Sequence, residues 1–118
     1  MSFSEITIIG YLGADPELKY TKNQNAVMTI SVGASERIKL SDPKDKKPKT
    51  YWHKCRRWGQ SAEQNKTFLK KGDKVFIKGH LVYDTWEDKA GRNHKDAVIE
   101  IDYLEKMHYE NITINLND

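Results

Sequence analysis

A period-two alternation of apolar and polar residues recurs along most of this 118-residue chain and limits how it can fold. It is clearest at Met28, Ile30 and Val32, which are separated by hydroxylated residues. Similar runs occupy residues 6–12, 74–78 and 97–102. Gly10 and Gly13 interrupt the first of these runs. Because successive side chains of a strand point to opposite faces, the alternation predicts amphipathic strands with one face in a core.

One segment departs from this alternation and carries the signals of a short helix. Ser61 is a good N-cap residue, and Gln64 follows it at the spacing of a capping box. Gly72, after two lysines, is a helix stop. The element order is then three strands, a helix and two strands. This order is typical of the OB-fold, so we predict an all-β, five-stranded Greek-key barrel with one short helix between strands three and four.

The length of the chain is enough for one core and not for two. We therefore assign residues 1–107 to the barrel domain and residues 108–118 to a short C-terminal extension. In that extension Ile112, Ile114 and Leu116 alternate with polar residues, which predicts one extra C-terminal strand.

Composition and the cysteine count exclude several classes of protein. No apolar run reaches the roughly 18 residues that a membrane-spanning helix needs. The first ten residues have no basic segment of the kind that opens a signal peptide. A single cysteine, Cys55, excludes an internal disulfide, and we expect it to be a small buried residue and not a nucleophile. We predict a cytoplasmic protein without a membrane partner.

Positive charge is concentrated in the middle of the chain. The net charge is only +3, but residues 37–58 hold nine lysines and arginines against two aspartates. Such a basic zone predicts a polyanionic partner. The alternative is a solvated lysine-rich loop that binds nothing.

Aromatic residues are interleaved with these charges. Trp52, Lys54, Arg56 and Trp58 have the same parity and therefore share one face of a strand. That face is poor core material, because two charges would be buried with it. It suits single-stranded nucleic acid, since flat rings stack on unpaired bases while cations follow the phosphates. The alternative is that Trp52 or Trp58 closes the barrel as part of its core.

Several segments together resemble the bacterial single-stranded DNA-binding protein family. They are residues 8–20, 50–53, 58–59, 68–72, 75–81 and the hairpin from Trp86 to Gly91, and the likeness extends over about residues 5–104. The resemblance implies an OB-fold assembled as a homo-oligomer, usually a tetramer, that binds single-stranded DNA without sequence preference. It also implies that Trp52, Trp58 and Trp86 stack on bases.

Seven cations are predicted to neutralise phosphates: Arg37, Lys39, Lys54, Arg56, Arg57, Lys71 and Lys78.

The chain departs from the family pattern in two places. After Ser35 and Glu36 the family usually has an aromatic residue, whereas this chain has Arg37, which can replace part of its stacking. The long linker and the acidic C-terminal tail of the family are also missing. We therefore do not expect replication and repair enzymes to be recruited through a tail.

No catalytic group, metal site or cofactor is predicted. The four histidines, His53, His80, His94 and His108, are scattered, and with one cysteine they give no zinc-binding spacing. The carboxylates around Trp86 (Asp84, Glu87 and Asp88) are interpreted as solvated charges of a hairpin.

We predict a non-enzymatic protein that binds and protects single-stranded DNA in replication, recombination and repair, associated with the nucleoid. Two alternatives remain open at this point. One is a primosome-type OB subunit, and the other is an OB scaffold whose tryptophans anchor a protein partner. A nuclease ranks well below both, because it would need clustered metal-binding carboxylates.

Overall fold

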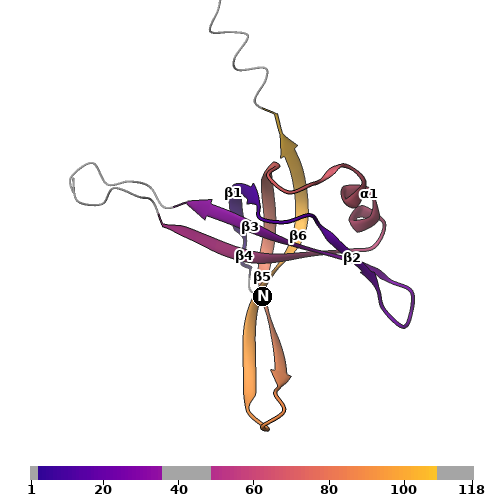
Figure 1. Cartoon of the computed structure of the whole chain (residues 1–118), viewed down its shortest axis with the longest axis vertical. Coiled ribbons are helices and arrows are strands. Elements are labelled where there is room, and N and C mark those ends of the chain that lie inside the picture. Colours follow the sequence, from indigo (N-terminus) through magenta and orange to yellow (C-terminus); the bar gives the residue numbers. More distant parts are fainter. Residues whose placement is uncertain (1–2, 36–48, 109–118) are drawn as a thin grey trace, which may run out of the picture.

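The computed structural model describes residues 3–35 and 49–108 and contains one short helix among strands (Figure 1). The elements are β1 (Ile6–Leu12), β2 (Glu17–Tyr20), β3 (Ala26–Ser35), β4 (Thr50–Trp58), α1 (Gln60–Phe68), β5 (Lys74–Glu87) and β6 (Asn93–Met107). The helix lies between β4 and β5. These are the third and fourth strands of the predicted order once β2, a short strand that was not predicted, is set aside.

The strands close into a five-membered ring in the order β1–β5–β6–β4–β3, with β1 pairing back to β3. This ring confirms the predicted five-stranded barrel. The closing contact is short, with Tyr11 opposite Gly33 and Leu12 opposite Val32. The pairing of β4 with β6 is parallel and equally short, because it consists of two residue pairs. β2 lies outside the ring and pairs with the first half of β3.

The interior of the barrel follows the predicted alternation. Met28, Ile30 and Val32 are all buried, as are Val75 and Ile77 on β5. The expected break at Gly10 is wrong, since this glycine lies inside β1. A methyl group at that position would collide with the Gly33 carbonyl of β3, so the glycine permits the close approach of the two strands.

The helix begins two residues earlier than predicted. Its N-cap is Gly59, which has a φ of 79° and no side chain to cap with, so Ser61 lies within the first turn and the predicted capping box is absent. It ends at Phe68, before Gly72, whose φ of 91° serves the turn into β5. Ala62 is fully buried and joins the helix to the core.

A long hairpin made of the end of β5 and the start of β6 projects from the barrel (Figure 1). A register shift between Lys78 and Gly79 marks its base, and no residue from 81 to 97 is buried. The hairpin is therefore held by cross-strand contacts and not by a core.

β6 ends at Met107. The predicted extra strand at Ile112–Leu116 falls outside the described residues. Within the parts of the chain that are described, no helix is long and apolar enough to cross a membrane.

Cys55 occupies the core side of β4 and is completely buried, as expected. Burial raises the pKa of its thiol to about 12. Because the thiolate is the reactive form, we predict that a thiol reagent at pH 8 leaves Cys55 unmodified in the folded protein and modifies it in urea. Rapid modification without denaturant, followed by absorbance or mass, would contradict this placement.

Candidate nucleic-acid interface

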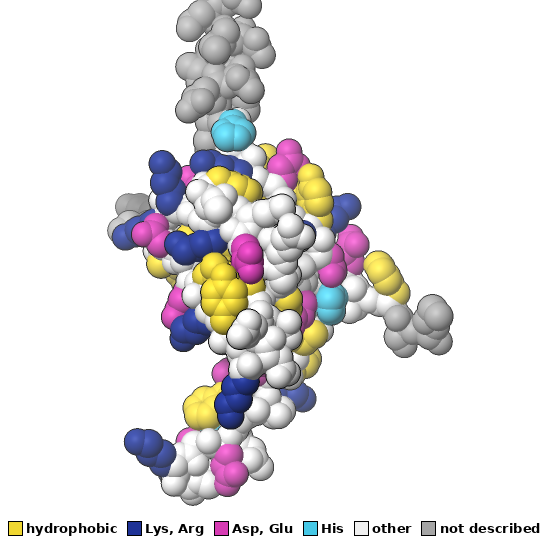
Figure 2. Space-filling model, turned by 90° about the vertical axis from the view of Figure 1, so that its right-hand side faces the viewer, with side chains coloured by type: hydrophobic (Ala, Val, Ile, Leu, Met, Phe, Trp, Pro, Cys, Tyr) yellow, Lys and Arg dark blue, Asp and Glu magenta, His cyan; other side chains and the backbone are white. Residues whose placement is uncertain are grey.

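All three tryptophans are exposed, with 59% of Trp52, 46% of Trp58 and 48% of Trp86 accessible to solvent. Trp52 and Trp58 therefore do not close the barrel as core residues. Hydrophobic, basic and acidic side chains are interspersed over the barrel surface and down the hairpin (Figure 2). Two of the exposed rings, Trp58 and Trp86, contact charged side chains directly.

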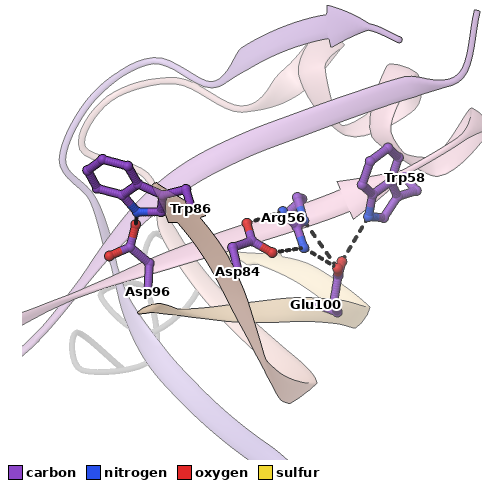
Figure 3. Close-up of polar contacts among 6 residues, drawn as sticks. All are labelled: Arg56, Trp58, Asp84, Trp86, Asp96 and Glu100. Atoms are coloured by element: carbon purple, nitrogen blue, oxygen red, sulfur yellow. Dashed lines mark hydrogen bonds and ion pairs between the residues drawn. The ribbon is translucent and has the colours of Figure 1, made fainter. Parts of the chain in front are cut away.

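A chain of polar contacts joins Trp58 to the neighbouring strands (Figure 3). The indole N–H of Trp58 donates to Oε2 of Glu100 at 2.9 Å. The other oxygen of Glu100 accepts from Nη2 of Arg56 at 2.6 Å, and Nη1 of Arg56 donates to Asp84 at 2.7 Å. These contacts place side chains of β4, β5 and β6 on one outer face.

Trp86 continues the same face at the hairpin. It has the parity of Asp84 on β5, and its indole N–H donates to Oδ2 of Asp96 on β6 at 2.7 Å (Figure 3). Asp84 and Asp96 are also direct cross-strand partners. The outer face of β4, β5 and β6 therefore carries Trp58 at the barrel and Trp86 on the hairpin.

One side of each of these two rings is covered by a basic residue. The His94 ring stacks on Trp86 with centroids 4.3 Å apart and planes at 17°. The Arg56 guanidinium lies over Trp58, 5.5 Å from its centroid. Stacking of this kind occupies one π face of an indole. The solvent-exposed area of each ring then lies on its other face and along its edges.

Trp52 is held differently, by backbone. Its six-membered ring lies against Gly13 and Gly33, where an added Cβ would come within 2.5 Å and 2.8 Å of Cζ3. Gly33 is also the direct partner of Trp52 in the β3–β4 pairing. Because the two glycines have no side chains, they leave a flat backbone surface on which the indole lies.

Arg56 is the most tightly held cation of the face. Its side chain is only 17% exposed between Asp84 and Glu100. Hydrogen bonds to Glu100 first and Asp84 second raise its pKa above the usual value. In return, the hydrogen bond from Arg56 lowers the pKa of Asp84. The guanidinium N–H groups of Arg56, which were predicted to bind phosphate, therefore already donate to carboxylates.

The other predicted cations lie in different surroundings. Lys54 is exposed between Trp52 and Arg56 on β4 and makes no ion pair with any described residue. Arg57 points away from that face and donates to the buried Asn65 of α1 at 3.0 Å.

Lys71 lies in the turn that follows α1, and Lys78 stands opposite Thr7 of β1. Neither takes part in the polar network around the tryptophans. Arg37 and Lys39 fall outside the described residues.

The acidic residues around Trp86 have roles that the sequence did not reveal. Asp84 and Asp88 were expected to be solvated, but Asp84 binds Arg56 and Asp88 lies 2.7 Å from Nε2 of His94. Asp88 also accepts hydrogen bonds from two backbone N–H groups of its turn, and these contacts, that with His94 first, lower its pKa. The one indication of these contacts in the sequence was the shared parity of Asp84 and Trp86, which places both on the same face of a strand.

Within the described residues, no three His, Cys, Asp or Glu side chains are grouped so that they could hold a metal ion. Cys55 is buried away from the exposed face. The arrangement offers aromatic faces, cations and anions for binding.

A sequence model of the Single-strand binding protein family matches residues 3–107 of the chain. The chain is also 37% identical, over 90 residues, to Single-stranded DNA-binding protein 1 of Xylella fastidiosa (strain 9a5c). This alignment covers 76% of the chain and 66% of that protein. The chain thus spans just under two thirds of the length of this relative.

The contact of the Trp52 ring with Gly13 and Gly33 leads to a prediction. In Gly13→Ala the three atoms nearest the new methyl group all belong to the Trp52 indole, so we expect the ring to move. With Trp58 and Trp86 replaced by Phe, Trp52 becomes the only tryptophan, and under selective excitation of tryptophan we expect its emission maximum to shift on Gly13→Ala. An unchanged emission spectrum would show that the ring does not rest on Gly13.

Proposed function

The chain belongs to the single-strand binding protein family, and we propose that it binds single-stranded DNA without sequence preference through the outer face of β4, β5 and β6. The family consists of non-enzymatic DNA-binding proteins, in agreement with the prediction that the chain is not an enzyme. Its role is to cover single strands during replication, recombination and repair.

The observation that carries this proposal is the exposure of three indoles on strands that also present cations. Exposed aromatic rings stack on any of the four bases, because each base has a π face. This supports binding without sequence preference. Duplex DNA should bind poorly, since its bases are already stacked on each other and cannot reach the rings.

The first candidate for phosphate neutralisation is Lys54, which stands beside Trp52. Its charge acts on Asp84 from a distance, but among the described residues it forms no direct ion pair. Arg56 is held between two carboxylates, Asp84 and Glu100. Because its donors are already paired, it is a weaker candidate for phosphate contact than its position on β4 suggested. We keep five further cations in the proposed phosphate path: Arg37, Lys39, Arg57, Lys71 and Lys78.

We also propose that the chain forms a homo-oligomer, a tetramer by analogy with the family, and acts in the cytoplasm at the nucleoid. An apolar patch on the outer side of β1, β5 and β6 supports the self-association. Ile9 and Tyr11 are about half exposed there, at 49% and 47%. Phe76, opposite Ile9, packs edge-on against Tyr103 with centroids 6.2 Å apart.

The experiment that tests the proposed function is a fluorescence titration with oligo-dT and with a matched duplex at low and moderate salt. We expect strong quenching by the single strand only, weakening as salt rises. Absence of quenching at low salt would overturn the stacking proposal. The exposed tryptophans would then be anchors for a protein partner, as in an OB scaffold or a primosome-type subunit.

Loss of a stacking ring should weaken binding. We predict that Trp52→Ala or Trp86→Ala lowers the affinity for oligo-dT by about 1–3 kcal/mol while the chain stays folded, because one base loses its platform. Tyr20→Ala is a matched control, since Tyr20 is an equally exposed aromatic residue (59%) on β2, outside this face. If a folded tryptophan variant binds like the control, that ring does not belong to the interface.

Loss of a phosphate contact should instead change the salt dependence. Lys54→Gln is expected to reduce the slope of log K against log salt by about 0.7, the value for one phosphate on a single strand. Base preference should stay the same. Lys22→Gln, in the exposed turn between β2 and β3, removes the same charge elsewhere and should leave the slope as it is. Equal slopes for Lys54→Gln and the unmodified chain would place Lys54 outside the DNA path.

A further inference from the structure

Two of the three exposed tryptophans are held by the same kind of contact. The indole N–H of Trp58 donates to Glu100 and that of Trp86 donates to Asp96, and both acceptors lie on β6 (Figure 3). Each ring is also covered on one side, by Arg56 or by His94. The same arrangement thus occurs twice, once on the barrel and once on the hairpin.

We propose that Glu100 and Asp96 are positioning residues, which fix the indole planes of Trp58 and Trp86 so that each ring offers one open face to a base. This inference rests on the proposed function and deepens it. Each of these two rings then takes a single base, because the opposite face is occupied by Arg56 or His94.

The acidic character of these two residues is otherwise unexpected. Negative charge on a surface that binds a polyanion repels the ligand and weakens binding. Arg56 compensates the charge of Glu100. The carboxylate of Asp96 has no ion pair among the described residues, and its one hydrogen bond there is to Trp86. A role for Asp96 in holding the ring accounts for a carboxylate at this position.

The physical benefit is a lower entropic cost of binding. An exposed indole on a strand can rotate about two side-chain bonds, and stacking on a base must stop that rotation. A hydrogen bond to an ionised acceptor is short and stronger than one between neutral groups. It therefore restricts the ring before the DNA arrives. Trp52 needs no such acceptor, since its ring already lies against the backbone of two glycines.

The test is a double-mutant cycle on Asp96 and Trp86, read by oligo-dT affinity. Asp96→Ala should weaken binding by roughly three- to tenfold, the range for one hydrogen bond. In a Trp86→Phe background, where the ring lacks an N–H, the same change should leave binding equal or slightly tighter. Asp96→Asn keeps an oxygen acceptor without the charge and should restore part of the affinity.

A purely electrostatic role for Asp96 gives the opposite pattern. Asp96→Ala and Asp96→Asn would then tighten binding equally, in both backgrounds, and this result would overturn the inference. Glu87→Gln is the matched control, because it removes one charge from the same hairpin and none of the indole contacts involves it. It should change affinity by the same factor with Trp86 or Phe at position 86.

A second readout uses the free protein. The three indole N–H groups give separate signals in a ¹H–¹⁵N spectrum, and Trp86→Phe and Trp58→Phe identify two of them. Asp96→Ala should move the Trp86 signal, and Glu100→Ala should move that of Trp58. Unmoved signals would overturn the positioning role even if the chain binds DNA. Absence of oligo-dT binding by the unmodified chain would instead overturn the proposed function, and the inference would fall with it.

Discussion

The forked contact of Arg56 with Asp84 and Glu100 joins three strands at one of the two shortest strand pairings of the barrel. β4 and β6 pair in parallel through two residue pairs, and Arg56 opposite Glu100 is one of them. The contact with Asp84 adds β5 to the same junction. Because the Arg56 side chain is largely buried, removing either carboxylate would leave some of its guanidinium N–H groups without an acceptor. The same Glu100 holds Trp58, so closure of the barrel and orientation of that ring depend on one group of side chains.

This sharing limits which cations can serve the ligand. Arg56 and Arg57 lie in the most basic part of the chain, yet Arg56 joins strands and Arg57 satisfies a buried amide of α1. An arginine whose donors are already paired meets a phosphate only by giving up some of those partners, whatever its position in a basic segment. Lys54 has no such ion-pair partner among the described residues, and its long flexible side chain can follow a phosphate. The local density of positive charge therefore overstates the number of cations that are free to meet DNA.

The sequence was sufficient for the five strands of the ring, the helix between them and the outward face of β4, because these depend on local patterns. It did not predict β2, which lies outside the ring. It was not sufficient for the start of the helix, since Gly59 caps α1 through its positive φ and leaves Ser61 without the expected role. The partners of Arg56 were also beyond prediction. They depend on the register of β5 and β6, which the shift at Gly79 sets through three-dimensional pairing. A parity rule identifies the face of a strand but not which neighbour stands opposite.

Each of the three tryptophans is supported by a different kind of contact, and the kind depends on how far the residue lies from the core. Trp52 lies where β3 meets β4, so the backbone of two glycines is close enough to support it. Trp58, at the end of β4, leans on side chains that also close the barrel. Trp86 stands on a hairpin with no buried residue between positions 81 and 97 and has to be held by its direct neighbours His94 and Asp96. Where a core is absent, stacking and charge-assisted hydrogen bonds are what remain to order a large ring. In the proposed interface, the polar residues of the hairpin therefore serve to hold the ring, although none of them needs to touch the ligand.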